Sequence, residues 1–320
     1  MEDVDDMIEI ADAYQRIRAH IKTTPMEISE KLSDICNGEV HLKLENQQHT
    51  GSFKVRGALS KMTSLTPVER ENGIVTASSG NHAQGVAYAS QIMGIFATIF
   101  VPQDVSPAKL MRLKEYDVKI VQGGGYNEVE RNARRYGEKN NLTYISPYND
   151  SSVIAGQGTI GLEIIDVVPE PDVVIVPVGG GGLIAGISTA IKNQCPSAKV
   201  LGVLTPGAST LYHSFKAGKL IKVDEFETLA EAFLGGVEEG SKTFDVAMQY
   251  VDDMHLVQEP SIAEAIRLLW SEKGQVVEGA GATSSALIME QPRMFAEKKV
   301  VVIVSGGNIH QDLFRNIVNA

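Results

Sequence analysis

The regular alternation of short apolar runs with helical patterns constrains the fold of this chain more than any other feature. Segments rich in Val and Ile recur along the sequence, and a segment with helical spacing of apolar residues follows most of them. Strands that are apolar along nearly their whole length are typical of a parallel sheet covered by helices on both faces. The expected strands are 73–78, 96–102, 118–122, 142–146, 172–178, 199–205 and 299–307. The expected helices are 4–21, 83–94, 108–116, 126–140 and 183–193.

Composition and charge narrow the classes of function. The 320 residues carry a formal net charge of −11, which argues against nucleic acid or an anionic membrane as a partner. The first ten residues are acidic, so we expect no secretory signal, and no apolar run reaches the length of a membrane span. Cys36 and Cys195 lie far apart without metal-ligand spacing. We expect a cytoplasmic protein.

A first loop of small residues, SSGNHAQG, lies between an expected strand and an expected helix. Free backbone N–H groups and the helix dipole favour an anion at such a place, and a substrate carboxylate is the natural occupant. The alternative is an ordinary helix cap, because Ser and Asn are common capping residues. The candidate binding residues are Ser78, Ser79, Gly80, Asn81 and His82.

A second loop, VGGGGLIAG, also joins a strand to a helix. Consecutive glycines are conformationally costly, but they let backbone N–H groups approach a ligand closely, and a phosphate is the best candidate. No Gly-Lys-Ser/Thr follows, so the loop is not a P-loop. A dinucleotide motif fits the spacing, yet the expected acidic residue is missing from the segment GVLTPGAST. The candidate phosphate-binding residues are Gly179, Gly180, Gly181 and Gly182.

A third loop ends the strand VIVSGGN with Ser305 and two glycines, and alone it indicates only a tight turn. The segment HTGSFKVRGAL places Lys54 at the start of an expected helix, where the dipole disfavours the charged amine. A phosphorylated aldehyde cofactor would give these features a common purpose. Its phosphate would bind the glycine loop, its ring nitrogen would meet Ser305, and its aldehyde would condense with Lys54. This is the chemistry of pyridoxal 5′-phosphate.

Six segments in a fixed order identify a family resemblance: TGSFKVRGA, SSGNHAQGVA, IAGQGTIGLEI, GGGGLIAG, VVEGAGA and VSGGN. On these motifs the chain resembles the fold-type II pyridoxal phosphate enzymes, in particular the threonine/serine dehydratase and serine racemase family, in a short form without a regulatory domain. The resemblance implies a two-lobed α/β fold like that of the tryptophan synthase β chain, with mostly parallel sheets. It implies a large cofactor-binding domain of residues 1–65 and 150–320 and a small mobile domain of residues 66–149. It also implies a homo-oligomer, a dimer or a tetramer.

The resemblance assigns roles to individual residues. Lys54 would form the Schiff base with the cofactor, and Phe53 would flank its ring. Asn81 would bond the ring hydroxyl, and Ser305 would face the ring nitrogen. Glu278 matches a position close to the cofactor.

The implied reaction is deamination of a β-hydroxy amino acid such as L-threonine or L-serine to a 2-oxo acid and ammonia. The freed Lys54 would remove the α-proton. Ser79 matches a hydroxyl on the opposite face, so racemisation is an alternative activity. A cofactor-binding protein without catalysis is a third alternative, which the intact Lys54, Ser79 and Glu278 disfavour.

The sequence also departs from its relatives. The two carboxylates of a cation site in the racemase branch fall on Thr205 and Leu211, so we expect no metal ion there. Tyr148 stands where racemases tend to carry Asn, which favours a dehydratase and makes Tyr148 a candidate substrate-binding residue whose hydroxyl needs a polar partner. The stretch GGVEEGSKTF resembles family members that act on less common hydroxy amino acids, such as 3-hydroxyaspartate.

Overall fold

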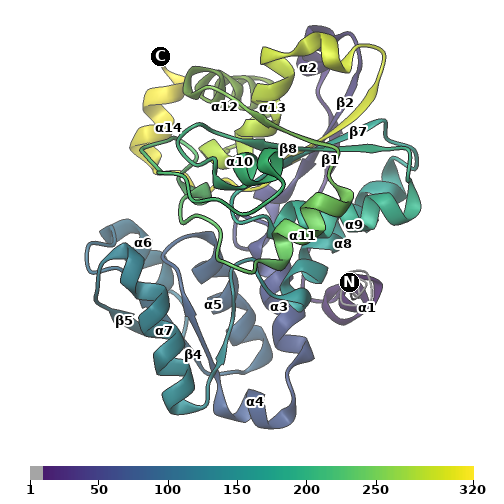
Figure 1. Cartoon of the computed structure of the whole chain (residues 1–320). Helices are drawn as coiled ribbons and strands as arrows, with labels where there is room; N and C mark the ends of the chain where they lie inside the picture. Colours follow the sequence, from purple (N-terminus) through teal and green to yellow (C-terminus); the bar gives the residue numbers. More distant parts are fainter. Residues whose placement is uncertain (1–9) are drawn as a thin grey trace.

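The structure, a computed structural model, describes residues 10–320, which form two lobes, each built on its own sheet (Figure 1). The upper lobe holds a six-stranded sheet in the order β1-β2-β10-β7-β8-β9. All neighbouring pairs in it are parallel except β1 and β2, which are antiparallel. Its strands are β1 (Met26–Ile28), β2 (Glu39–Leu44), β7 (Val173–Pro177), β8 (Lys199–Leu204), β9 (Asp253–Leu256) and β10 (Lys299–Val304).

Helices cover both faces of this sheet because its central strands are apolar on both sides. In β10, Val300 and Val302 pack in one cluster with α2, α12, α13 and α14, whereas Val301 and Ile303 pack in another with α8, α9, α10 and α11. The covering helices are α2 (Glu30–Cys36), α8 (Ser151–Val167), α9 (Gly182–Gln194), α10 (Thr210–Ala217), α11 (Lys242–Tyr250), α12 (Glu259–Lys273), α13 (Gly279–Glu290) and α14 (Gln311–Val318).

The lower lobe holds a four-stranded, fully parallel sheet in the order β5-β4-β3-β6. One face packs on α5 and α6, and the other packs on α7. The strands are β3 (Ile74–Ala77), β4 (Ala97–Val101), β5 (Lys119–Gln122) and β6 (Thr143–Tyr144). The helices are α4 (Pro67–Asn72), α5 (Asn81–Met93), α6 (Pro107–Leu113) and α7 (Tyr126–Asn140).

The predicted α/β fold with mostly parallel sheets is confirmed. The expected elements are present with ends that differ by a few residues, and the structure adds elements that were not expected, among them β1, β2, β9 and α8. Helix α5 begins at Asn81, two residues earlier than expected, so the SSGN loop runs directly into it. Strand β10 stops at Val304, because Ser305 already belongs to the loop that follows. Of the predicted helix 4–21, the structure describes α1 (Ile10–Ile17). Residues 18–21 form a turn and a bend instead of a helix, and residues 4, 7 and 8 lie outside the described residues.

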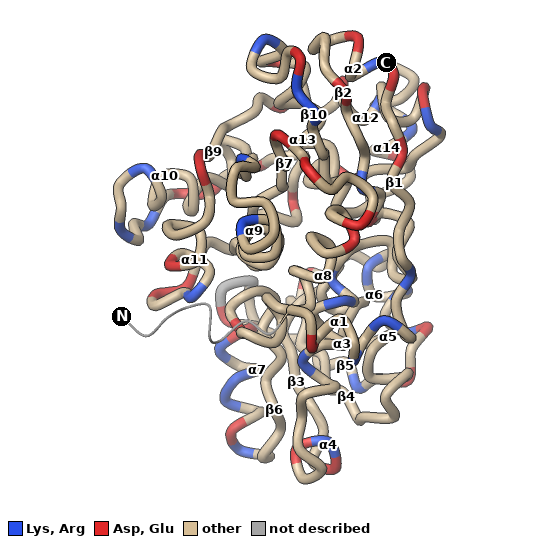
Figure 2. Tube along the Cα trace, turned by 90° about the vertical axis from the view of Figure 1, so that its right-hand side faces the viewer, with Lys and Arg blue, Asp and Glu red and all other residues tan. Residues whose placement is uncertain are grey.

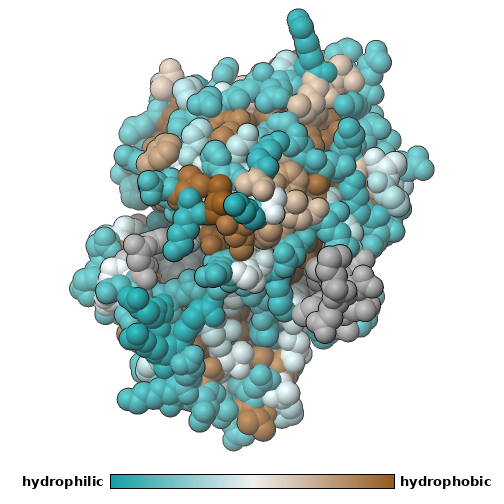
Figure 3. Space-filling model, in the orientation of Figure 1, coloured by the Kyte–Doolittle hydropathy of each residue, from teal (hydrophilic) through white to brown (hydrophobic). Residues whose placement is uncertain are grey.

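No helix in residues 10–320 is both long and apolar enough to cross a bilayer. Basic and acidic residues are interspersed along both lobes (Figure 2). The space-filling view is mostly hydrophilic, with apolar atoms gathered over the middle, where α10 and α11 lie in Figure 1 (Figure 3).

Helix α3 (Lys54–Ser64) joins the two lobes and is held by close helix packing. A Cβ on Gly85 of α5 would lie 3.0 Å from the backbone of Lys54, and a Cβ on Gly156 of α8 would lie 2.7 Å from the Cα of Gly57. Small residues at these two contacts therefore let α5 and α8 pack directly on the backbone of α3. The first residue of α3 is Lys54, so this packing fixes the position of the predicted cofactor lysine.

A fully buried ionic network lies beneath the start of α3. The Arg56 guanidinium bonds Glu45 Oε1 at 2.8 Å and Glu163 Oε1 at 2.7 Å, and the Lys43 ammonium bonds Glu163 Oε2 at 2.6 Å. Burial alone would lower the pKa of Arg56, but the two carboxylates outweigh it and raise that pKa. The two cations and two carboxylates balance, which makes the cost of burying them tolerable.

Glu163→Gln is expected to destabilise the protein by about 3–5 kcal/mol, because it leaves one buried cation without a counter-charge. Urea unfolding followed by circular dichroism measures the change. Asp312→Asn is the matched control: it removes one carboxylate from an exposed ion pair with Arg315 and should change stability little. Equal midpoints for the two variants would contradict a structural role for the network.

Candidate active site

The three loops predicted to bind ligand all follow the carboxyl ends of parallel strands. The SSGN loop follows β3, the glycine loop follows β7, and the loop with Ser305 follows β10. Ligands of open parallel sheets bind at these ends of the strands. Two contacts show that the segment before Lys54 meets the loop after β10: Ser52 pairs with Gly306, and Phe53 N–H donates to the carbonyl of Ser305 at 3.2 Å.

Lys54 has the environment of a reactive amine. Its side chain is half-buried, its Nζ donates to the carbonyl of Pro147 at 2.8 Å, and Nζ lies 5.1 Å from the centre of the Phe53 ring. Loss of solvent around the amine lowers the pKa of Lys54 to about 8, although the carboxylate of Glu278 opposes the shift. We expected the helix dipole to lower this pKa; the structure shows that desolvation is the main cause.

The glycine loop forms a tight cradle. A Cβ on Gly180 would lie 2.5 Å from Cδ1 of the Tyr148 ring, and a Cβ on Gly182 would lie 3.0 Å from the Tyr148 backbone. Gly181 has a φ of 89°, a left-handed conformation that favours glycine, and caps α9. The hydroxyl of Thr243 donates to the carbonyl of Gly180 at 2.7 Å and fixes the loop from outside. The first N–H groups of α9 have no partner within their own helix, so the cradle suits an anion.

Tyr148 lies against this cradle. Its ring packs on Gly180, and its hydroxyl accepts a hydrogen bond from the backbone N–H of Glu238 at 3.0 Å. The expected polar partner of the hydroxyl is therefore present. Burial raises the pKa of Tyr148, so the phenol stays neutral at physiological pH. A neutral phenol locked between two loops shapes the site rather than carrying charge.

The side chains of Asn81 and Glu278 form a direct hydrogen bond, although almost two hundred residues separate them in the sequence. The Asn81 amide donates to Glu278 Oε1 at 2.6 Å, and Asn308 donates to Asn81 Oδ1 at 2.6 Å. Burial raises the pKa of the Glu278 carboxyl to about 7, and the bond from Asn81 moderates the shift. Asn308 was not singled out as a site residue, although it ends the VSGGN segment, so the sequence did contain a signal for it.

The SSGN loop leaves open space for a ligand. Ser78 Oγ accepts a hydrogen bond from the Gly80 N–H at 3.2 Å, and nothing lies within 4 Å of the place where a Cβ on Gly80 would be. Ser78, Ser79 and Gly80 are all partly exposed. This opening at the start of α5 fits the predicted site for a carboxylate.

The His82 ring, by contrast, is turned into the lower lobe. Its Nε2 lies 3.0 Å from the hydroxyl of Thr76 and 3.1 Å from the carbonyl of Ile145. Burial, and secondarily the charge of Lys54, lower the pKa of His82 to about 3, so the ring is neutral. The ring nitrogen Nε2 is therefore engaged by the lower lobe and is not available for the predicted substrate contact. The ring itself ties α5 to the segment that carries Pro147.

Thr205 and Leu211, the two positions that match a cation site in relatives, both have buried side chains. Thr205 is buried, and its hydroxyl lies 3.2 Å from that of Thr228. Leu211 is fully buried in the core cluster around α9 and α10. Within residues 10–320 no group of three or more His, Cys, Asp or Glu side chains is arranged to hold a metal ion.

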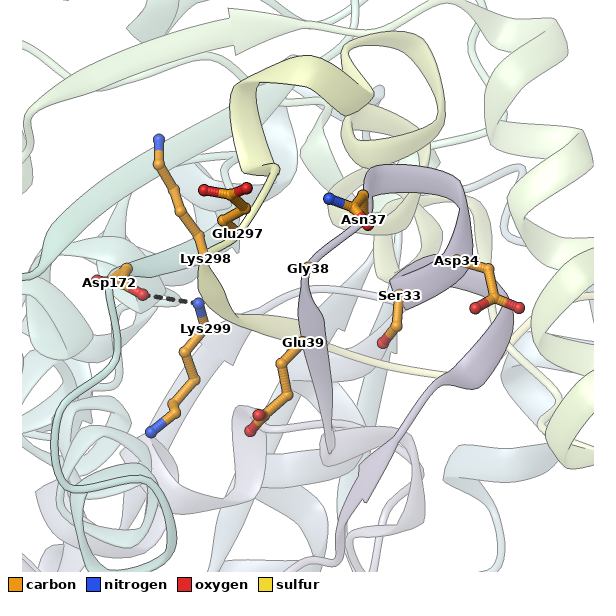
Figure 4. A pocket seen from close by; sticks show the side chains of 9 residues that line it. All are labelled: Ser33, Asp34, Asn37, Gly38, Glu39, Asp172, Glu297, Lys298 and Lys299. Atoms are coloured by element: carbon orange, nitrogen blue, oxygen red, sulfur yellow. Dashed lines mark hydrogen bonds between the residues drawn. The ribbon is translucent and has the colours of Figure 1, made fainter.

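A separate hollow lies at the other ends of the strands of the six-stranded sheet, away from the ligand loops (Figure 4). It is formed around the start of β2, the start of β10 and Asp172 before β7, and Asp172 accepts a hydrogen bond from the Lys299 N–H at 2.7 Å. The glycine loop and Ser305 lie at the other ends of β7 and β10. The hollow is therefore not part of the candidate active site.

The residues of the site fit a phosphorylated aldehyde cofactor. The glycine cradle suits the phosphate, because it lies at the N-terminus of α9, where the first backbone N–H groups have no partner within the helix. A desolvated lysine whose pKa is about 8 suits condensation with the aldehyde. Ser305 is buried beside Phe53 and Lys54. The residue expected to face the ring nitrogen is therefore a serine and not a carboxylate. Together these features define a pyridoxal phosphate enzyme.

Comparison with known proteins leads to the same class of enzyme. The family model described as "Pyridoxal-phosphate dependent enzyme" matches residues 17–306, and the chain belongs to this family. The chain is 41% identical over 312 residues to an L-threonine ammonia-lyase of Thermotoga maritima, covering 97% of this chain and 77% of that protein.

Solved structures show the same fold over nearly the whole chain. Maize serine racemase has a TM-score of 0.91 at 32% identity, covering 98% of this chain and 96% of its own. The processed form of threonine deaminase isoform 2 from Solanum lycopersicum has a TM-score of 0.89 at 32% identity, covering 97% and 93%. A racemase and a deaminase are thus both among its structural neighbours.

Covalent attachment of the cofactor should depend on pH in the way that a lysine pKa of about 8 requires. Only the neutral amine condenses, so its fraction rises about tenfold from pH 7 to pH 9 and then levels off. The measurement is the rate at which the cofactor absorbance band forms after pyridoxal phosphate is added to cofactor-free protein. A rate that keeps rising beyond pH 10, as for N-acetyl-lysine in solution, would contradict the lowered pKa.

Proposed function

We propose that this protein deaminates a β-hydroxy amino acid, with L-threonine and L-serine as reference substrates, to a 2-oxo acid and ammonia. The observation that carries the proposal is Lys54: a desolvated amine whose pKa is about 8, at the junction of the ligand loops. The names of similar proteins, threonine ammonia-lyase and threonine deaminase, support the same reaction.

The chain's own residues divide the work. The N-terminus of α5 with Ser78, Ser79 and Gly80 binds the substrate carboxylate through backbone N–H groups and hydroxyls. Lys54 takes the α-proton, since an amine with a pKa near the working pH is an effective general base. Pyridoxal phosphate, when bound, supplies the electron sink that stabilises the negative charge left at the α-carbon. The β-hydroxyl leaves as water, and hydrolysis then releases the 2-oxo acid and ammonia.

The positions of the cofactor contacts are part of the proposal. The cradle of residues 179–182 would hold the phosphate, and Phe53 would lie beside the ring. Asn81 would bond the ring hydroxyl, and Ser305 would face the ring nitrogen. Glu278 supports Asn81 through their 2.6 Å hydrogen bond. Ser305 would offer the ring nitrogen a hydroxyl rather than a carboxylate.

Closure of the small lobe over the substrate is also proposed, with residues 66–149 moving against residues 1–65 and 150–320. Two ion pairs already cross between these regions: Lys109 to Glu231 at 3.2 Å and Arg134 to Glu238 at 3.1 Å. Helix α3 packs against α5 across the proposed boundary. The chain crosses that boundary near residues 65–66 and 149–150, so the hinge would lie there. Closure would exclude water from Lys54 during proton transfer.

Racemisation is the second candidate, and the fold shared with maize serine racemase favours it. It would need the Ser79 hydroxyl to deliver a proton to the face opposite Lys54. Tyr148 counts against it, because the aromatic residue fills the space beside the glycine cradle where racemases tend to carry Asn.

The test is 2-oxo acid release from L- and D-serine, L- and D-threonine and 3-hydroxyaspartate, with chiral analysis of the remaining substrate. Rapid oxo-acid release from an L-hydroxy amino acid is expected. Exchange of enantiomers without oxo acid would establish a racemase and overturn the proposal. Size-exclusion chromatography with light scattering tests the predicted dimer or tetramer, and a cytoplasmic location likewise stays a prediction.

A further inference from the structure

Arg112, on helix α6 of the small lobe, has a charge that nothing in the described chain balances. Its Nη1 donates to the side-chain oxygen of Asn308 at 3.2 Å, and no carboxylate among residues 10–320 lies within ion-pair distance of it. Two other small-lobe cations that reach the large lobe, Lys109 and Arg134, each pair with a glutamate. A half-buried guanidinium with five donors and one neutral acceptor is poised for an anion.

The position of Arg112 connects it to the substrate loop. Its partner Asn308 donates to Asn81 Oδ1 at 2.6 Å, and Asn81 is the first residue of α5. The guanidinium is therefore two hydrogen bonds from the helix N-terminus at which we place the substrate carboxylate. The carboxyl group of Glu278 lies on the same network, but it already accepts hydrogen bonds from the Asn81 amide and from the backbone N–H of Asn308.

Simple closure of the lobes would not need an arginine here. Asn308 is neutral, and its amide nitrogen is already occupied by Thr50 and Asn81. Arginine differs from other donors in that its planar fork binds a carboxylate through two parallel hydrogen bonds. An anionic substrate side chain would give Arg112 this partner and would neutralise the charge on closure.

We propose that Arg112 binds an anionic substrate side chain, and that the preferred substrate is a β-hydroxy amino dicarboxylate of the 3-hydroxyaspartate type. This inference rests on the proposed deamination. The substrate loses water from its α- and β-carbons, and the same amount of water is taken up when the nitrogen is released. The products are the 2-oxo dicarboxylate and ammonia, so no oxidant or reductant is required.

The test compares kcat/KM for threo- and erythro-3-hydroxyaspartate with kcat/KM for L-threonine in the holoenzyme. Arg112→Met is expected to lower the value for the better 3-hydroxyaspartate isomer by about 10- to 100-fold, as loss of a charge-assisted hydrogen bond implies, and to leave that for L-threonine within about threefold. Arg112→Lys should restore part of the loss, because the charge is kept. Lys114→Met, which removes an exposed charge two residues further along the chain, is the matched control and should not change the ratio.

Binding gives a second readout that does not depend on turnover. L-Aspartate and L-alanine lack the leaving hydroxyl, and their affinities are measured from the change in cofactor absorbance of the holoenzyme. The wild-type protein should prefer L-aspartate, and Arg112→Met should abolish the preference.

The outcomes separate the inference from the proposed function. An equal loss for all substrates, or no selective loss, would overturn the role of Arg112, as would equal affinity for aspartate and alanine in the wild type. Absence of oxo acid from every hydroxy amino acid would overturn the proposed deamination. The aspartate titration would still decide whether Arg112 selects an anion.

Discussion

Lys54→Met is expected to abolish turnover and, at the same time, to make the cofactor-free protein more stable. The substitution removes both the covalent attachment point and the general base, so activity should fall by at least about 1,000-fold. A lysine whose pKa falls from 10.5 to about 8 carries an energetic cost of about 3 kcal/mol while it is protonated. Methionine, apolar and of similar length, removes that cost.

The gain in stability should depend on pH with a definite sign. The folded protein holds the Lys54 proton less tightly than the unfolded chain does, so the cost is fully present below about pH 8. It fades as the pH rises from 8 towards 10.5, where the unfolded chain loses the proton too. Urea unfolding of cofactor-free protein should therefore show a gain of about 1–3 kcal/mol at pH 7 and little gain near pH 10.

Lys114→Met is the control for the same loss of charge at an exposed position, and it should alter neither stability nor activity appreciably. Substantial turnover by Lys54→Met would refute the role of Lys54 in catalysis. A loss of stability at pH 7 would show instead that the amine contributes net stabilising interactions through the carbonyl of Pro147.

Gly180→Ala is expected to weaken cofactor binding at least about 30-fold and to destabilise the protein by about 1–3 kcal/mol. The added Cβ would lie 2.5–2.7 Å from three atoms of the Tyr148 ring, so either the ring or the loop must move. Movement of the loop opens the cradle and misdirects its N–H groups. Titration of the cofactor-free protein with pyridoxal phosphate measures the affinity, and urea unfolding measures the stability.

Two further variants define the cause of this loss. Tyr148→Leu combined with Gly180→Ala should recover part of the stability, with a coupling energy of about 1 kcal/mol or more between the two sites. Gly123→Ala is the control, since nothing lies within 4 Å of a Cβ at that position. Normal cofactor affinity in Gly180→Ala would mean that the cradle does not bind the phosphate.

The parts of the fold that follow from local pattern were predictable. Strand β7 and helix α9 are apolar on both sides, and helix α7 spans the predicted residues 126–140. The loops with Ser79, with the four glycines and with Ser305 were found because each follows a strand and interrupts the pattern with small residues. Lys54 was found because its segment resembles a family motif.

The parts that depend on distant pairs were not predictable. Arg56 and Glu163 are 107 positions apart, and Asn81 and Asn308 are 227 positions apart. No local pattern records such partners. The same reason hides Arg112, which sits in an ordinary helical pattern and shows its role only when α6 is placed against the loop after β10.

Helical spacing alone predicts that Trp270 of α12 lies in the core, and this prediction is wrong. Its side chain is 42% exposed and packs edge-on against the ring of Phe314. The apolar stripe of α12 is real, but it is carried by Ile262, Ile266 and Leu269, and Trp270 lies at its margin. A single sequence does not show where such a stripe ends.

The central claim is that Lys54 carries the cofactor in a site built from loops of both lobes. The most direct measurement is reduction of the holoenzyme with borohydride, followed by protease digestion and mass spectrometry of the peptides. We predict a single pyridoxyl group on Lys54, with loss of the visible absorbance band, and no labelling in Lys54→Met. A pyridoxyl group on another lysine, or a holoenzyme that borohydride does not change, would contradict the account.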